Sequence, residues 1–239
     1  MTRAQLISAV ALRMDEITPS AGLSVTVDGS DNNPLATLID GIIDDGVLEL
    51  YSVAPFWRLS QTAFVYSPVP SQTEIAIARI DGLDSNSRKI IRIKVPEDFL
   101  RIAQIDCPGF QRPITEVFTE QSAEGRRQHN RYLMGKEAKP VAVMAFSNAF
   151  PGTVESCREI QCYSLAADST AAASNVNASY IAKPAVISDT ATPAVAVEDV
   201  VPAPLIGALE WLVAARAFGA RGDLNHANIC QQNAQNLLM

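Results

Sequence analysis

The sequence predicts an α+β fold, in which helices from both ends of the chain form one helical body and a mostly antiparallel β-domain is inserted between them. Apolar residues recur at helical spacing near both ends, and apolar and polar residues alternate in the middle. Proline or glycine marks most of the borders between these segments. We therefore expect N-terminal helices in residues 1–60, a β-rich domain in 61–183, and an extended segment and helices in 184–239 that complete the helical body.

The N-terminal part predicts two helices. Thr2 and Gln5 have the spacing of a capping box, and the apolar pattern after them predicts a helix over residues 3–17. After a loop at 20–33, Asn33 can cap a second helix that runs from Pro34 to about Val53. Its apolar residues form one broad stripe, which must pack on something: Leu35, Leu38, Ile39, Ile42, Ile43, Val47 and Tyr51.

Four acidic residues gather on the opposite side of this second helix: Asp40, Asp44, Asp45 and Glu49. They are expected to be solvated helix positions. A ring of copies would multiply them into a negative wall, which repels phosphate and suits a channel through which DNA must slide without sticking.

The middle of the chain predicts a small sheet. Strand patterns at 74–80 and 89–95 suggest a hairpin with its turn around Asp81-Gly82, and Pro96–Arg101 has the pattern of a single helical turn. Further strands are expected at 102–106, 114–118, 141–145 and 159–165.

The last third predicts a loop, an extended segment and two helices. Residues 166–179 are rich in Ala, Ser, Asn and Thr, so we expect a long mobile loop or arm. Residues 184–204 should be extended because of their prolines and β-branched residues. A helix is expected over 205–218, and Asp223 can cap another over 224–238.

The net charge of −7 is unevenly distributed. Residues 1–87 carry 4 basic and 11 acidic side chains, residues 88–139 carry 11 and 7, and residues 140–239 carry 4 and 8. Affinity for phosphate comes chiefly from clustered Lys and Arg, so this balance argues against nucleic-acid binding as the main task. The central basic block alternates with acids and is expected to form a solvated or subunit-facing surface.

No motif for catalysis, a cofactor or a metal is present. The sequence lacks the G-x-S-x-G, Walker-type and G-x-G-x-x-G loops, and neither His129 nor His226 has a second ligand at helical spacing. Adjacent carboxylates on a helix point about 100° apart and cannot flank one bond as acid and base. The four cysteines are expected to stay reduced and mostly buried: Cys107, Cys157, Cys162 and Cys230. No signal peptide and no apolar run of roughly 18 residues is expected, which predicts assembly in the cytoplasm.

Two motifs carry a family resemblance. The run Pro96-Glu97-Asp98-Phe99-Leu100-Arg101-Ile102, followed by Phe110-Gln111-Arg112-Pro113-Ile114, resembles the pattern P-x-D-F-L-R-(L/I) then W-x-R-P-(V/I) of head-tail connector proteins of tailed bacteriophages. The ring proteins of crAss-like phages are especially similar, and tail tubular protein A of short-tailed phages more distantly so. Phe110 stands where relatives often have Trp. Residues 48–55, 139–143 and 202–218 also look like that group.

The resemblance implies a structural virion protein, not an enzyme, without a cofactor. In that family the subunit forms a dodecameric ring beneath the portal, with helices around the DNA channel. The implied partners are copies of itself, the portal protein and other ring or tail proteins, at the head-tail junction, after assembly in the bacterial cytoplasm. Genomic DNA passes without sequence-specific binding, and no membrane is involved.

The motif residues also have a structural interpretation. Pro96 starts a turn that Phe99 and Leu100 anchor in the core, and Arg112-Pro113 begins a strand beside a possible carboxylate partner. Asp98 and Arg101 belong to the same motif.

Two other function classes stay open. One is a virion-associated glycan hydrolase, which would need a cleft holding two carboxyls about 5–10 Å apart. The other is a tail-tube or receptor-binding module, which position in the virion and oligomer order would distinguish.

Overall fold

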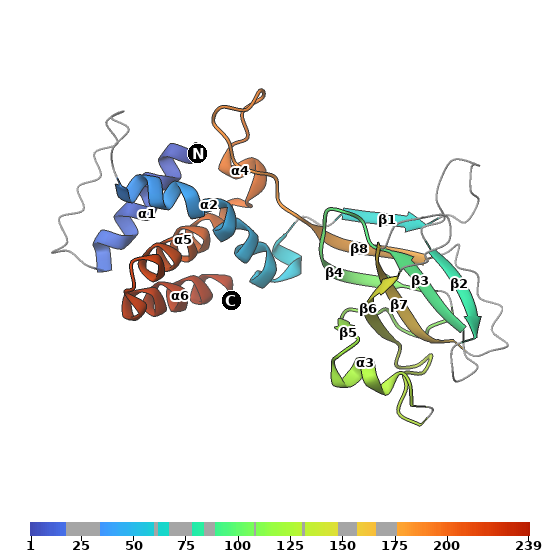
Figure 1. Cartoon of the computed structure of the whole chain (residues 1–239). Coiled ribbons are helices and arrows are strands. Elements are labelled where there is room, and N and C mark those ends of the chain that lie inside the picture. Colours follow the sequence, from blue (N-terminus) through green and yellow to red (C-terminus); the bar gives the residue numbers. More distant parts are fainter. Residues whose placement is uncertain are drawn as a thin grey trace. The chain divides into compact units, whose positions relative to one another are not determined.

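The computed structural model describes residues 1–17, 34–59, 62–66, 78–83, 89–107, 109–130, 132–147, 157–165 and 176–239. The chain divides into two compact units, Met1–Ser60 with Lys183–Met239 and Gln61–Ala182, which we call the helical unit and the β unit. The predicted α+β class is confirmed, because N- and C-terminal helices pack together and the sheets come between them in the chain (Figure 1).

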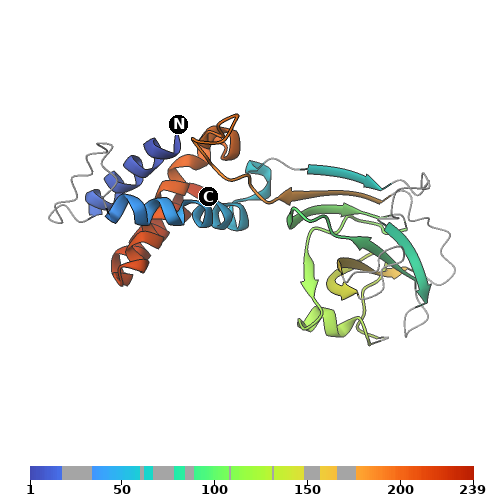
Figure 2. The same ribbon diagram turned by 45° about the horizontal axis from the view of Figure 1, so that its top comes forward.

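The helical unit is built from both ends of the chain, coloured blue and orange to red in Figures 1 and 2. Its elements are α1 (Arg3–Ile17), α2 (Pro34–Val53), the 3₁₀ turn η1 (Phe56–Arg58), α4 (Val197–Val200), the 3₁₀ turn η3 (Ala203–Leu205), α5 (Ile206–Ala220) and α6 (Leu224–Leu238). All four long helices lie where the sequence predicts them.

Two of the predicted helix caps are confirmed. Thr2 Oγ1 accepts a hydrogen bond from the Gln5 amide at 3.2 Å, and Gln5 Oε1 accepts one from the Thr2 amide at 2.9 Å. Asp223 caps α6 by accepting from the His226 amide at 3.2 Å. The predicted loop at 20–33, with its cap, lies outside the described residues.

Helix α5 is the core of the helical unit. It packs against α1, α2 and α6, and buried side chains occur around most of its circumference: Ala208, Leu209, Leu212, Val213, Ala214, Ala217 and Phe218. The stretch Ala203–Ala220 is long and apolar enough to cross a membrane by length and composition, so the expectation that no segment reaches that threshold is wrong. A core helix passes the same test, and α5 has the packing of one.

The β unit contains two sheets. Its elements are β1 (Thr62–Tyr66), β2 (Ala78–Leu83), β3 (Lys89–Lys94), β4 (Phe99–Asp106), β5 (Val117–Thr119), α3 (Ala123–Arg127), β6 (Val141–Ser147), β7 (Cys157–Leu165) and β8 (Val176–Ala182). The strand orders are β1-β8-β4 and β2-β3-β7-β6-β5, antiparallel except for the pair β5 and β6. One apolar cluster takes buried side chains from both sheets, so the sheets pack face to face.

Two predicted local structures are wrong, and two others are corrected in part. Asp81-Gly82 lie inside β2, at an irregularity in its pairing with β3, and form no turn. The segment from Pro96 is a β-turn, because the Phe99 amide donates to the Pro96 carbonyl at 3.2 Å and β4 starts at Phe99. Residues 176–179 of the expected arm belong to β8, whereas 166–175 lie outside the described residues. The segment 184–204, expected to be extended, contains α4 and η3.

Two glycines of α2 provide a matched test of this packing. A Cβ at Gly46 would lie 2.5 Å from Val213 Cγ2 of α5, whereas a Cβ at Gly41 would meet nothing within 4 Å. We expect Gly46→Ala to lower the free energy of unfolding by about 1–3 kcal/mol through overpacking. Gly41→Ala should raise it by about 0.5–1 kcal/mol through helix propensity. Urea denaturation of both variants measures this, and equal effects would contradict the close approach of α2 to α5.

Candidate protein interaction site

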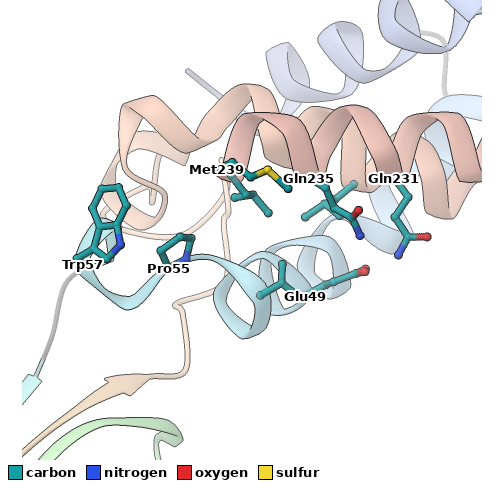
Figure 3. Close-up of a pocket in the computed structure, with 9 residues that line it drawn as sticks. Glu49, Pro55, Trp57, Gln231, Gln235 and Met239 are labelled. Carbon is teal, nitrogen blue, oxygen red and sulfur yellow. The ribbon is translucent and has the colours of Figure 1, made fainter. Parts of the chain in front are cut away.

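The helical unit has an open groove of about 630 Å³ between α6 and the end of α2. Figure 3 shows Gln231, Gln235 and Met239 reaching it from the α6 side, Glu49 from α2, and Pro55 and Trp57 from the segment after α2. The remaining lining residues are apolar: Val53, Leu212 and Leu238. A concave, mostly apolar surface with a few polar groups is typical of a binding site.

Trp57 forms an aromatic wall of this groove, and contacts of neighbouring residues hold it in position. Pro55 has no amide hydrogen and follows the end of α2, where the chain turns into η1. Arg58 Nη1 donates to the Leu237 carbonyl of α6 at 2.9 Å, and its guanidinium carbon lies 4.8 Å from the Trp57 ring centroid. Arg58 thus ties the segment to α6 and supports Trp57 by a cation–π contact.

Apolar side chains around the groove are unusually exposed. Trp57 is 63% exposed, Val53 54% and Met239 88%, and all three line the groove. Such side chains gathered at one groove indicate a surface that a partner covers. The sequence contains a weak signal for this surface, because the adjacent aromatic residues Phe56 and Trp57 directly follow Pro55, the proline after α2.

The four acids of α2 are partly neutralised within the helical unit. Arg3 of α1 binds Asp40 Oδ1 at 2.5 Å and Asp44 Oδ1 at 3.1 Å. Arg216 of α5 binds Glu49 at 2.6 Å and approaches Asp45 at 3.7 Å. Asp40, Asp44 and Asp45 are exposed, as the sequence predicts, whereas Glu49 is half-buried and lines the groove. Two arginines against four carboxylates leave this surface negative.

The first family motif lies at the junction of the two sheets in the β unit. Phe99 is buried and stacks on Tyr180 of β8 with ring centroids 5.8 Å apart. Asp98 is exposed and accepts a hydrogen bond from the Tyr180 hydroxyl at 2.9 Å. Burial, followed by this hydrogen bond, raises the pKa of Tyr180. The motif therefore fixes the passage from β3 to β4.

The other motif positions are less buried. Pro96, Leu100 and Arg101 are half-buried, and burial lowers the pKa of Arg101. Arg112 and Pro113 are exposed and precede Ile114, which forms an isolated bridge with Ile105. Among the described residues, Arg112 forms no ion pair, so the expected carboxylate partner is not found there.

Buried polar groups of the described chain serve structure. Glu159 is fully buried in β7 and binds Arg92 of β3, with Nη2 2.8 Å from Oε2. Cys107, Cys162 and Cys230 are free and buried, and burial raises the pKa of Cys230 to about 11. Such thiols are poor nucleophiles near neutral pH. Within the ranges that the structure describes, no cluster of three His, Cys, Asp or Glu side chains could hold a metal ion.

Comparison with known proteins adds no assignment: no protein-family model matches the chain, and no curated protein matches it.

The two family motifs should differ in their effect on stability. Phe99→Ala should lower the free energy of unfolding by about 3–5 kcal/mol, because it empties a packed position between the two sheets. Arg112→Ala should change it by no more than about 0.5 kcal/mol, because the side chain is exposed. Denaturant unfolding of both variants is the measurement. A large loss in Arg112→Ala would contradict its exposed placement.

Proposed function

We propose that this chain is a structural virion protein: a ring-forming head-tail adaptor that connects the portal to the tail and forms part of the DNA channel. The observation that carries the structural role is the open apolar groove with exposed aromatic walls on the helical unit. Exposed apolar side chains gathered at one place mark surfaces where another protein binds. The resemblance of the two motifs supports the place at the head-tail junction.

The distribution of charge also supports a channel role. The helical unit carries 6 basic and 13 acidic side chains, whereas the β unit carries 13 of each, so the net charge of −7 belongs to the helical unit. In a ring whose channel is lined by α2, the acids Asp40, Asp44 and Asp45 would repel the phosphates of passing DNA. A glycan hydrolase has less support, because among the described residues Glu49 alone contributes a carboxylate side chain to the lining of this groove.

Assembly is the first test of this proposal. We expect the purified chain, alone or added to phage heads that lack it, to form closed rings visible by negative-stain electron microscopy. Those rings should sit at the portal vertex and allow tails to attach. A chain that stays monomeric and leaves such heads unchanged would refute the proposal.

The placement of α2 at the channel is tested by charge removal. The double variant Asp40→Asn, Asp44→Asn removes two negative charges per copy and leaves Arg3 uncompensated. We expect rings to form normally and genome ejection to slow, because DNA phosphate would then be attracted to the wall. Glu97→Gln with Glu116→Gln is the control, since it removes two exposed acids of the β unit. Ejection at the wild-type rate from assembled particles would argue against the channel placement.

A further inference from the structure

Two cysteine side chains meet between the sheets of the β unit. Cys107 directly follows β4 of the three-stranded sheet, and Cys162 lies in β7 of the five-stranded sheet. Both belong to the apolar cluster between the sheets, where Cys107 is 3% exposed and Cys162 is fully buried. The side chain of Cys162 hydrogen-bonds to that of Cys107. The two thiols therefore contact each other across the interface between the sheets.

The alternation of side chains along the two strands directs both cysteines inward. Ala103 and Ile105 of β4 are buried at an interval of two, and Cys107 continues this alternation. Ile160 and Cys162 of β7 are buried with the same spacing. Since successive residues of a strand point to opposite faces, the backbone of each sheet fixes the direction of its thiol.

Hydrogen bonds also hold both backbones in place. Cys162 is paired with Ile91 of β3 on one side and with Ala142 of β6 on the other. Cys107 is held at the end of β4, where its carbonyl accepts a hydrogen bond from the Phe110 amide at 3.3 Å. Two thiols held in contact favour a disulfide over further oxidation of either sulfur, because a second thiol is in reach of the first oxidised one.

The two thiols differ in their reactivity. The hydrogen bond to Cys107 raises the pKa of Cys162 well above its usual range, and burial and the negative charge of a Cys107 thiolate add to this effect. Cys162 therefore keeps its proton and donates it to the hydrogen bond. Cys107 is the less buried thiol and lies at a strand end, where local opening costs less than in the middle of a sheet. An oxidant therefore reaches Cys107 first.

We propose that Cys107 and Cys162 form a disulfide that braces the two sheets when the protein meets a peroxide. The Cys107 thiolate attacks one oxygen of hydrogen peroxide and breaks the O–O bond; this leaves a sulfenic acid on Cys107, and the proton that Cys107 gave up completes a molecule of water. The Cys162 sulfur then attacks the Cys107 sulfur, so the S–S bond forms and the S–O bond breaks. The departing hydroxide takes the Cys162 proton as a second water. Two thiols thus lose two electrons and two protons, and the peroxide takes up both.

This inference goes beyond the adaptor function and does not depend on it. In the cytoplasm, glutathione and thioredoxin keep such thiols reduced. A virion released from the cell leaves these reductants behind. For a virion protein, the brace would therefore form after assembly and release.

Intact mass and thermal unfolding of the full chain test this inference. Reduced, purified protein is treated with hydrogen peroxide for hours, because buried thiols react slowly. We expect each chain to lose two hydrogen atoms without covalent dimers, and a non-reduced digest to contain a peptide in which Cys107 is linked to Cys162. The disulfide closes a loop of about 55 residues, so the melting temperature should rise by about 5–15 °C and return to its first value with dithiothreitol.

Three variants separate this pair from the other cysteines. Cys107→Ala and Cys162→Ala should each show no rise in melting temperature on oxidation. Cys230→Ala removes a buried thiol of α6 and should show the same rise as wild type. Each comparison is between the oxidised and reduced forms of one variant, so a loss of stability from the substitution itself cancels. The linked peptide of wild type decides the question even where a variant fails to fold.

Other outcomes overturn the inference. Thiols that stay free, or oxygen added to Cys107 without a link, would mean that the two sulfurs cannot approach to bonding distance. A link to Cys157 or Cys230, or between two chains, would mean that another pair reacts. A link between Cys107 and Cys162 that leaves the melting temperature unchanged would show that it does not brace the sheets.

Discussion

The burial of α5 is the constraint on which the helical unit depends. An apolar helix with buried side chains around most of its circumference needs cover from several directions, and α6 alone cannot provide it. The rest of the cover comes from α1 and α2, which belong to the opposite end of the chain. The chain therefore leaves the helical unit after Ser60, builds the β unit, and must return at Lys183 to complete the same core.

The elements that could be predicted from the sequence are those that interactions between residues close in the chain determine. Helices α1, α2, α5 and α6 were predictable because their apolar periodicity is long, and α1 and α6 also have capping side chains three residues from the amide that they cap. The turn at Pro96 was mistaken for a helical turn, since proline and acids favour both, and pairing of β4 with β8 decides between them. Asp81-Gly82 has turn chemistry, but Ile80 and Leu83 on either side pair with β3, and the dipeptide stays within the strand as an irregularity.

Strand β8 shows how composition can hide an element. Its polar residues suggest a loop, yet Val176, Ala178 and Tyr180 alternate with more exposed residues and face the core. Strand β8 is the central strand of its three-stranded sheet, so pairing with β1 and β4 holds it in place. The period of two was present in the sequence, but residues of low β-propensity masked it.

The candidate site could be predicted only in part, because its residues are distant in sequence. The acids of α2 were predictable from periodicity, whereas Arg3 and Arg216, which partly neutralise them, come from the two ends of the chain. The groove likewise needs α6 to lie beside the segment after α2, which Arg58 helps to secure through the Leu237 carbonyl. No local pattern encodes such a pairing.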